Sequence, residues 1–64
     1  MDCDWVFVSQ DRSRQEVTLQ ESAIPRLGEG KVYAGKGYEV ILVVEKRITQ
    51  PNPLVLAFEF VQKS

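Results

Sequence analysis

Few side chains in this 64-residue chain could do chemistry, and their types exclude several kinds of site. The chain has no histidine and a single cysteine, Cys3, so we expect neither an internal disulfide nor a zinc site built from protein ligands. Without a histidine to activate a serine, nucleophilic catalysis has no supporting motif. Cys3 stands between Asp2 and Asp4, and neighbouring carboxylates raise the pKa of a thiol and lower its reactivity.

Two further patterns could belong to an active site. Glu45 and Glu59 lie in neighbouring segments, but acid-base chemistry needs two carboxylates in unlike environments, and nothing around them predicts a cleft. The Gly-Glu-Gly sequence at 28–30 and the Gly-Lys-Gly sequence at 35–37 match neither the dinucleotide fingerprint nor the phosphate-loop spacing. We interpret both as turns and predict that the chain is not an enzyme and uses no cofactor or metal.

One group of cationic and aromatic residues is a candidate ligand-binding site. Tyr33 and Tyr38 flank the Gly-Lys-Gly turn, which contains Lys36, while Lys31 and Arg26 lie upstream. Such residues could stack on a nucleic-acid base or hold an acidic ligand. The alternative is that both tyrosines are ordinary half-buried residues with hydroxyls in water. A formal net charge of −1 does not favour nucleic acid, because binding to phosphates needs a basic surplus or stripe.

The length and composition favour one small domain over residues 1–64. A chain of this size buries only about 60% of its unfolded surface, so we expect marginal stability or help from a partner. The first residues lack the cationic region of a signal peptide, and no stretch approaches the ~18 apolar residues of a membrane-spanning helix. We expect a cytoplasmic protein with no membrane partner.

Five segments have the alternating, β-branched or aromatic composition of strands. They are residues 5–8, 15–20, 31–34, 38–48 and 54–62. The stretch 21–30 contains one proline and two glycines and fits a bent loop. Gly35 and Gly37 fit a tight hairpin turn with a glycine at positive φ, and we expect Gly37 to be the more sensitive of the two. Pro51 and Pro53 fix the last reversal, and a bend is expected midway along 38–48.

The last two segments form a hairpin whose two faces can be predicted. If Ile48 lies opposite Leu54, the even-numbered residues share a nearly all-apolar face, which we expect to be the core and to include Phe58. Five apolar residues on the odd-numbered face need cover: Ile41, Val43, Val55, Ala57 and Val61. Segment 5–8 could fold over them, or a second copy of the chain or another partner could do so. The candidate interface residues are Ile41, Val43, Val55 and Val61.

The stretch Ile-Pro-Arg-Leu-Gly-Glu at 24–29, followed by Val32, the glycine turn and Tyr-Glu-Val at 38–40, resembles the small Src-homology-3-like barrels of short bacterial and phage proteins. The resemblance covers residues 24–61 and implies a barrel fold without naming a ligand. The aromatic and acidic groove motif of the proline-peptide-binding members is absent.

These observations predict an all-β protein in which five strands form an antiparallel meander that closes into a small barrel. The alternative is an open antiparallel sheet completed by dimerisation. We expect a non-catalytic binding module, most simply a protein-interaction domain with a protein partner and a possible homodimer. The other two hypotheses are a single-stranded nucleic-acid binder and a protein that sequesters a small ligand, as a phage-type inhibitor does.

Overall fold

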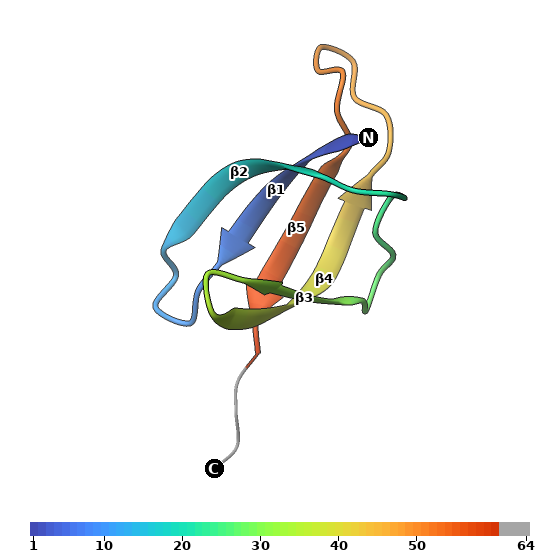
Figure 1. Ribbon diagram of the computed structural model, residues 1–64. Helices are drawn as coiled ribbons and strands as arrows, with labels where there is room; N and C mark the ends of the chain where they lie inside the picture. The colour runs from blue at the N-terminus through green and yellow to red at the C-terminus, as the bar shows by residue number, and fades with distance from the viewer. Residues whose placement is uncertain (61–64) are drawn as a thin grey trace.

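The chain forms one curled sheet of five strands in the computed structural model, which describes residues 1–60 (Figure 1). The strands are β1 (Asp2–Val8), β2 (Arg14–Gln20), β3 (Gly30–Tyr33), β4 (Lys36–Val44) and β5 (Leu54–Glu59). Their order in the sheet is β2-β1-β5-β4-β3, and residues 1–60 contain no helix. The sheet is an open half-barrel, with β2 and β3 at its two edges.

The all-β class and the five strands are confirmed, whereas the antiparallel meander that closes into a barrel is wrong. β1 pairs with β2 in antiparallel and with β5 in parallel, and the second pairing places Trp5 beside Val55. The β1–β2 hairpin and the β3–β4–β5 meander are therefore two units joined side by side. Side-chain alternation reports which face of a strand is buried but not the direction of its neighbour, so the sequence pattern could not distinguish the two arrangements.

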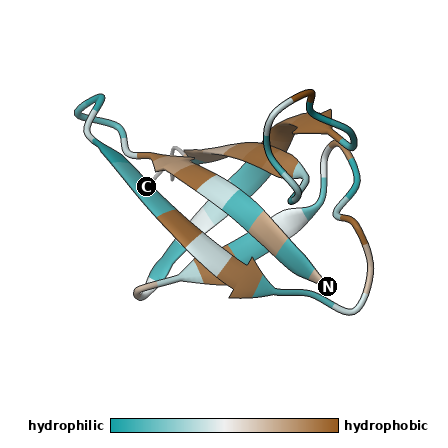
Figure 2. Ribbon diagram, turned by 90° about the horizontal axis from the view of Figure 1, so that it is seen from above, coloured by the Kyte–Doolittle hydropathy of each residue, from teal (hydrophilic) through white to brown (hydrophobic). Residues whose placement is uncertain are grey.

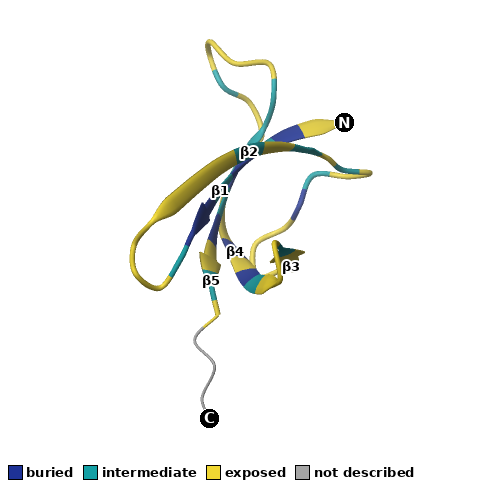
Figure 3. Cartoon of the chain, turned by 60° about the vertical axis from the view of Figure 1, so that its left-hand side comes forward, coloured by how far each residue is buried: buried dark blue, intermediate teal, exposed yellow. Residues whose placement is uncertain are grey.

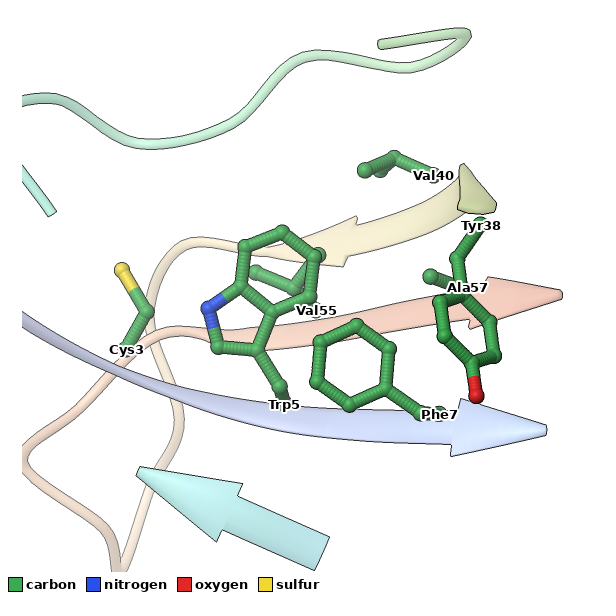
Figure 4. Close-up of a cluster of buried hydrophobic side chains, with 7 residues drawn as sticks. All are labelled: Cys3, Trp5, Phe7, Tyr38, Val40, Val55 and Ala57. Atoms are coloured by element: carbon green, nitrogen blue, oxygen red, sulfur yellow. The ribbon is translucent and has the colours of Figure 1, made fainter. Parts of the chain in front are cut away.

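The core lies on the inner face of the half-barrel and is built mainly from odd-numbered residues of β1 and β5 (Figure 4). Its buried side chains are Cys3, Trp5, Phe7, Tyr38, Val40, Val55 and Ala57. Phe7 is at its centre: its ring is stacked on Trp5 with 5.1 Å between centroids and tilted by 49° against Tyr38 with 4.7 Å between centroids. Aromatic pairs of this kind stabilise by about 0.5–1.5 kcal/mol beyond the area that they bury.

The two ends of the sheet approach each other across this core. Tyr33 of β3 stacks on Phe7 with 4.5 Å between ring centroids. Lys31, also on β3, lies 5.3 Å above the Trp5 ring and forms an ion pair with Glu21, which follows β2. Side chains of the short edge strand β3 thus cover the open side of the core. Figure 3 shows that the buried segments are concentrated on β1, β4 and β5.

The predicted register of the last hairpin is wrong. Leu42 pairs with Leu56 and Val40 with Ala57, and the register shifts between Val40 and Leu42. This β-bulge is the bend expected midway along the strand, and it changes which residues face inward. Tyr38 and Val40 are buried as predicted, but Phe58 is 44% exposed because the inner face of β5 consists of odd-numbered residues.

The connection between β4 and β5 is also longer than predicted. β4 ends at Val44, so residues 45–53 form the loop and Ile48 is fully exposed. Arg47 donates from Nε to the carbonyl oxygen of Asn52 at 2.9 Å, which holds the loop as a compact turn. Its guanidinium also pairs with Asp4 of β1.

The turn between β3 and β4 contains two residues at positive φ. Ala34 has φ 51° and Gly35 has φ 80°, which is the pattern of a two-residue type I′ hairpin turn. A glycine at positive φ was expected, but Gly35 and not Gly37 has this conformation. A β-carbon on Gly37 would instead lie 3.1 Å from the ring of Phe60.

The strained turn residue predicts a stabilising substitution. Ala34→Asn creates the Asn-Gly pair that type I′ turns prefer, because asparagine tolerates positive φ better than alanine does. We expect stabilisation by about 0.5–1 kcal/mol and a Tm higher by several degrees, measured by thermal melting. Ala23→Asn, at an exposed position without positive φ, is the control and should leave Tm nearly unchanged. A lower Tm for Ala34→Asn would contradict the turn conformation.

The two faces of the sheet predict unequal costs for two phenylalanine truncations. Phe7→Ala removes a ring that is 1% exposed, and such a loss typically costs about 3–5 kcal/mol, enough to unfold a domain of this size. Phe58→Ala removes a 44% exposed ring and should cost much less. Urea denaturation compares the two free energies of unfolding, and equal losses would show that the inner and outer faces are misassigned.

Candidate functional site

The outer face of the half-barrel carries a regular array of side chains in three rows across four strands. Paired residues point to the same side of a sheet, so the registers of β2, β1, β5 and β4 define each row. In this strand order the rows are Arg14, Val8, Phe58 and Glu39; Glu16, Val6, Leu56 and Leu42; and Thr18, Asp4, Leu54 and Val44.

Seven of these twelve side chains are apolar and contiguous, and we call them the apolar outer face. They are Val6, Val8, Leu42, Val44, Leu54, Leu56 and Phe58. Leu42 is 47% and Phe58 44% exposed, Val8 is buried, and the other four are half-buried. Within residues 1–60 no second layer of structure packs on this face. Figure 2 shows that apolar and polar residues alternate along the strands.

A hydrogen-bonded network around Asp4 fixes one end of the array. Thr18 donates to Asp4 Oδ1 at 2.8 Å and Asn52 donates to the same oxygen at 3.1 Å, while Arg47 pairs with Oδ2. The Asn52, Thr18 and Arg47 hydrogen bonds hold the pKa of Asp4 below its ordinary value. The network ties the 45–53 loop to β1 and β2 and borders a hollow of about 240 Å³.

A second hollow, of about 590 Å³, lies at the other end of the array. Val8 and Phe58 contribute apolar walls and Arg12 a cation. The turn between β1 and β2 is held against the end of β5 because the Gln10 side chain donates to the Phe60 carbonyl oxygen at 2.9 Å and its backbone N–H donates to Glu59 at 3.0 Å. The apolar outer face is thus continuous with a hollow at each end, and each hollow contains an arginine.

Four of the five candidate ligand-binding residues lie on the β3–β4 hairpin, where Lys31 pairs with Tyr38 and Tyr33 with Lys36. Tyr38 is 1% exposed and belongs to the core, whereas Tyr33 is half-buried with one face of its ring stacked on Phe7. Lys31 is engaged by Glu21 at 2.9 Å. Lys36 lies at the turn, 4.0 Å from Glu59, and Arg26 is exposed on the 21–29 loop. The hypothesis that these five residues form one ligand-binding site stays a prediction.

The candidate interface residues lie mostly inside the fold. Val55 is fully buried and Val43 packs against the core, because the bulge at Ile41 turns the odd-numbered residues beyond it inward. Ile41 itself is 39% exposed, and Val61 lies outside the described residues. A second apolar surface was expected, but it consists of the even-numbered residues of β1 and β5 and of Leu42 and Val44. The signal was present in β1, where apolar residues at 5–8 occupy both faces.

The potentially reactive groups are poorly placed for chemistry. Burial raises the pKa of the Cys3 thiol, and the negative charge of Glu21 raises it further, so the thiolate is disfavoured.

The Trp5 indole N–H is buried without a hydrogen-bond partner among residues 1–60. In the same residues no three potential metal ligands gather, and no helix is long and apolar enough to cross a membrane. The array on the outer face is best suited to packing against another apolar surface.

No protein-family model, curated protein or solved structure shows a significant match to this chain. The resemblance to Src-homology-3-like barrels therefore stays a prediction.

The Asp4 network predicts a pH-dependent contribution to stability. Because the folded-state pKa of Asp4 lies below its ordinary value of 3.8, its ionised form stabilises the fold above the unfolded-state pKa. This stabilisation is lost as the pH falls through the folded-state pKa. Asp4→Asn should lower Tm at pH 7, and its difference from the wild type should shrink progressively below about pH 4. Asp2→Asn, at an exposed position, is the control; a difference independent of pH would contradict the role of the charge.

Proposed function

We propose that this chain is a non-catalytic protein-interaction domain that binds through its apolar outer face. The observation that supports this function most strongly is the exposure of Leu42 and Phe58 in a contiguous array of seven apolar side chains. Contiguous apolar surface on a small protein is costly to leave in water and commonly marks a contact site. The array lies on three hydrogen-bonded strands, so it is held ready for a partner without further ordering.

The borders of the array define the chemistry of the partner. Arg14 and Glu39 lie at opposite ends of the first row, separated by Val8 and Phe58. A complementary protein surface therefore has an apolar centre with an acidic group opposite Arg14 and a basic group opposite Glu39. The mixed signs favour a protein over a nucleic acid, whose phosphates would be repelled by Glu16 and Glu39.

Site-specific photo-crosslinking in cells tests this function. A photoreactive phenylalanine analogue replaces Leu42 on the apolar outer face or, as the matched control, Ile48, which is fully exposed on the 45–53 loop. We expect one predominant crosslinked protein at position 42, either the chain itself or another protein, and none at position 48. The protein is then identified by mass spectrometry and purified.

The affinity of the captured protein is then measured for the wild-type chain and for the Leu56→Lys variant. This substitution places a charge in the middle of the array. We expect at least a tenfold higher Kd for Leu56→Lys, with little change for Ile48→Lys. Equal crosslinking at positions 42 and 48, or an affinity that Leu56→Lys leaves unchanged, would contradict the proposed function.

A further inference from the structure

We infer that the occupant of the apolar outer face is a second copy of this chain, related by a two-fold axis that runs parallel to the strands between β1 and β5. This inference depends on the proposed function, because it names the partner of the same face. It follows from the order of residues in the three rows and from the signs of the charges at their borders.

The rotation exchanges β1 with β5 and β2 with β4 between the two copies. It keeps each row at its own level, because the axis runs along the strands. Val6 then lies opposite Leu56 of the second copy, and Val8 lies opposite Phe58 of the second copy. Two sheets pack face to face about 10 Å apart, a distance that opposed side chains of this size can fill.

The same rotation brings opposite charges together. Arg14 lies on β2 and Glu39 on β4 in the first row, so each arginine faces the glutamate of the other copy. Symmetry creates two such pairs, one at each border of the contact. Both side chains are long, so they can bridge the sheets where the outer surfaces of two half-barrels curve apart.

The other simple two-fold arrangement is disfavoured by charge. An axis that runs across the strands would keep each strand over its own copy and exchange the first row with the third. The second row would then face itself and place Glu16 against Glu16, whereas the axis parallel to the strands places Glu16 opposite Leu42 of the second copy. Like charges opposed at an interface are destabilising, so the axis parallel to the strands is preferred.

The size of the array predicts a weak dimer. With neighbouring strands about 4.8 Å apart and alternate residues about 6.7 Å apart, three rows on four strands cover roughly 400 Å² per copy. Standard stable interfaces bury about 800 Å² per partner. We therefore expect association that depends on concentration, with a Kd of roughly 10–100 µM.

Sedimentation equilibrium of the full chain between about 10 and 500 µM tests the inference. We expect a monomer–dimer equilibrium in the wild type and a monomer for Leu56→Lys. Arg14→Glu and Glu39→Arg should each raise Kd about fivefold to tenfold, because each introduces two like-charge contacts in the symmetric dimer. The double variant Arg14→Glu with Glu39→Arg restores both pairs in reversed order and should return Kd to near the wild-type value.

Glu29→Arg makes the same charge change away from the apolar outer face and should leave Kd unchanged. Thermal melts establish that every variant is folded. A wild-type monomer at 500 µM, or a double variant that dimerises no better than the single ones, would overturn the second copy as occupant. If the photoreactive group at position 42 then still captures another protein whose binding Leu56→Lys abolishes, only this inference fails; if it captures none, the proposed function fails as well.

Discussion

The parallel pairing of β1 with β5 is the constraint on which the rest of this structure depends. It joins an N-terminal hairpin to a C-terminal three-stranded meander, and it places Trp5 and Phe7 beside Val55 and Ala57 on the inner face. Without this junction the β1–β2 unit could not bury its apolar side chains, because an isolated hairpin is at best marginally stable in water. The same junction aligns the opposite side chains of β1 and β5, so the core and the apolar outer face are two consequences of one register.

The core limits how the sheet can curve. Phe7 contacts rings from β3 and β4, which requires the far edge of the sheet to bend back over β1. The bulge between Val40 and Leu42 supplies the bend in β4, and the Lys31–Glu21 ion pair spans the remaining opening. The Lys31–Glu21 pair is half-buried, and the aromatic contacts, each worth about 0.5–1.5 kcal/mol beyond the area that they bury, add to the stability of this closure.

The sequence was sufficient to predict the strand content and the glycine turn, because both follow from local composition. It was insufficient for the register of β4 with β5: one extra residue at the bulge reverses the inward-facing set, and alternation alone cannot locate such an insertion. Consequently Val43 and Val55 were expected on a contact surface and instead belong to the interior, whereas Phe58 was expected in the core and is exposed. The pairing of Lys31 with Glu21, ten residues earlier in the chain, could not be predicted either, because the intervening loop has no regular pattern. The composition did predict that the chain has more apolar side chains than one face of the sheet can bury.

Cross-strand nuclear Overhauser effects between backbone protons in the labelled protein distinguish a parallel pairing of β1 with β5 from an antiparallel one. We expect contacts that link the region of Asp4 with Leu54 and the region of Val8 with Phe58. Contacts that instead link Asp4 with Phe58 and Val8 with Leu54 would indicate an antiparallel pair. They would contradict the three rows on the outer face and the two-fold arrangement inferred from them.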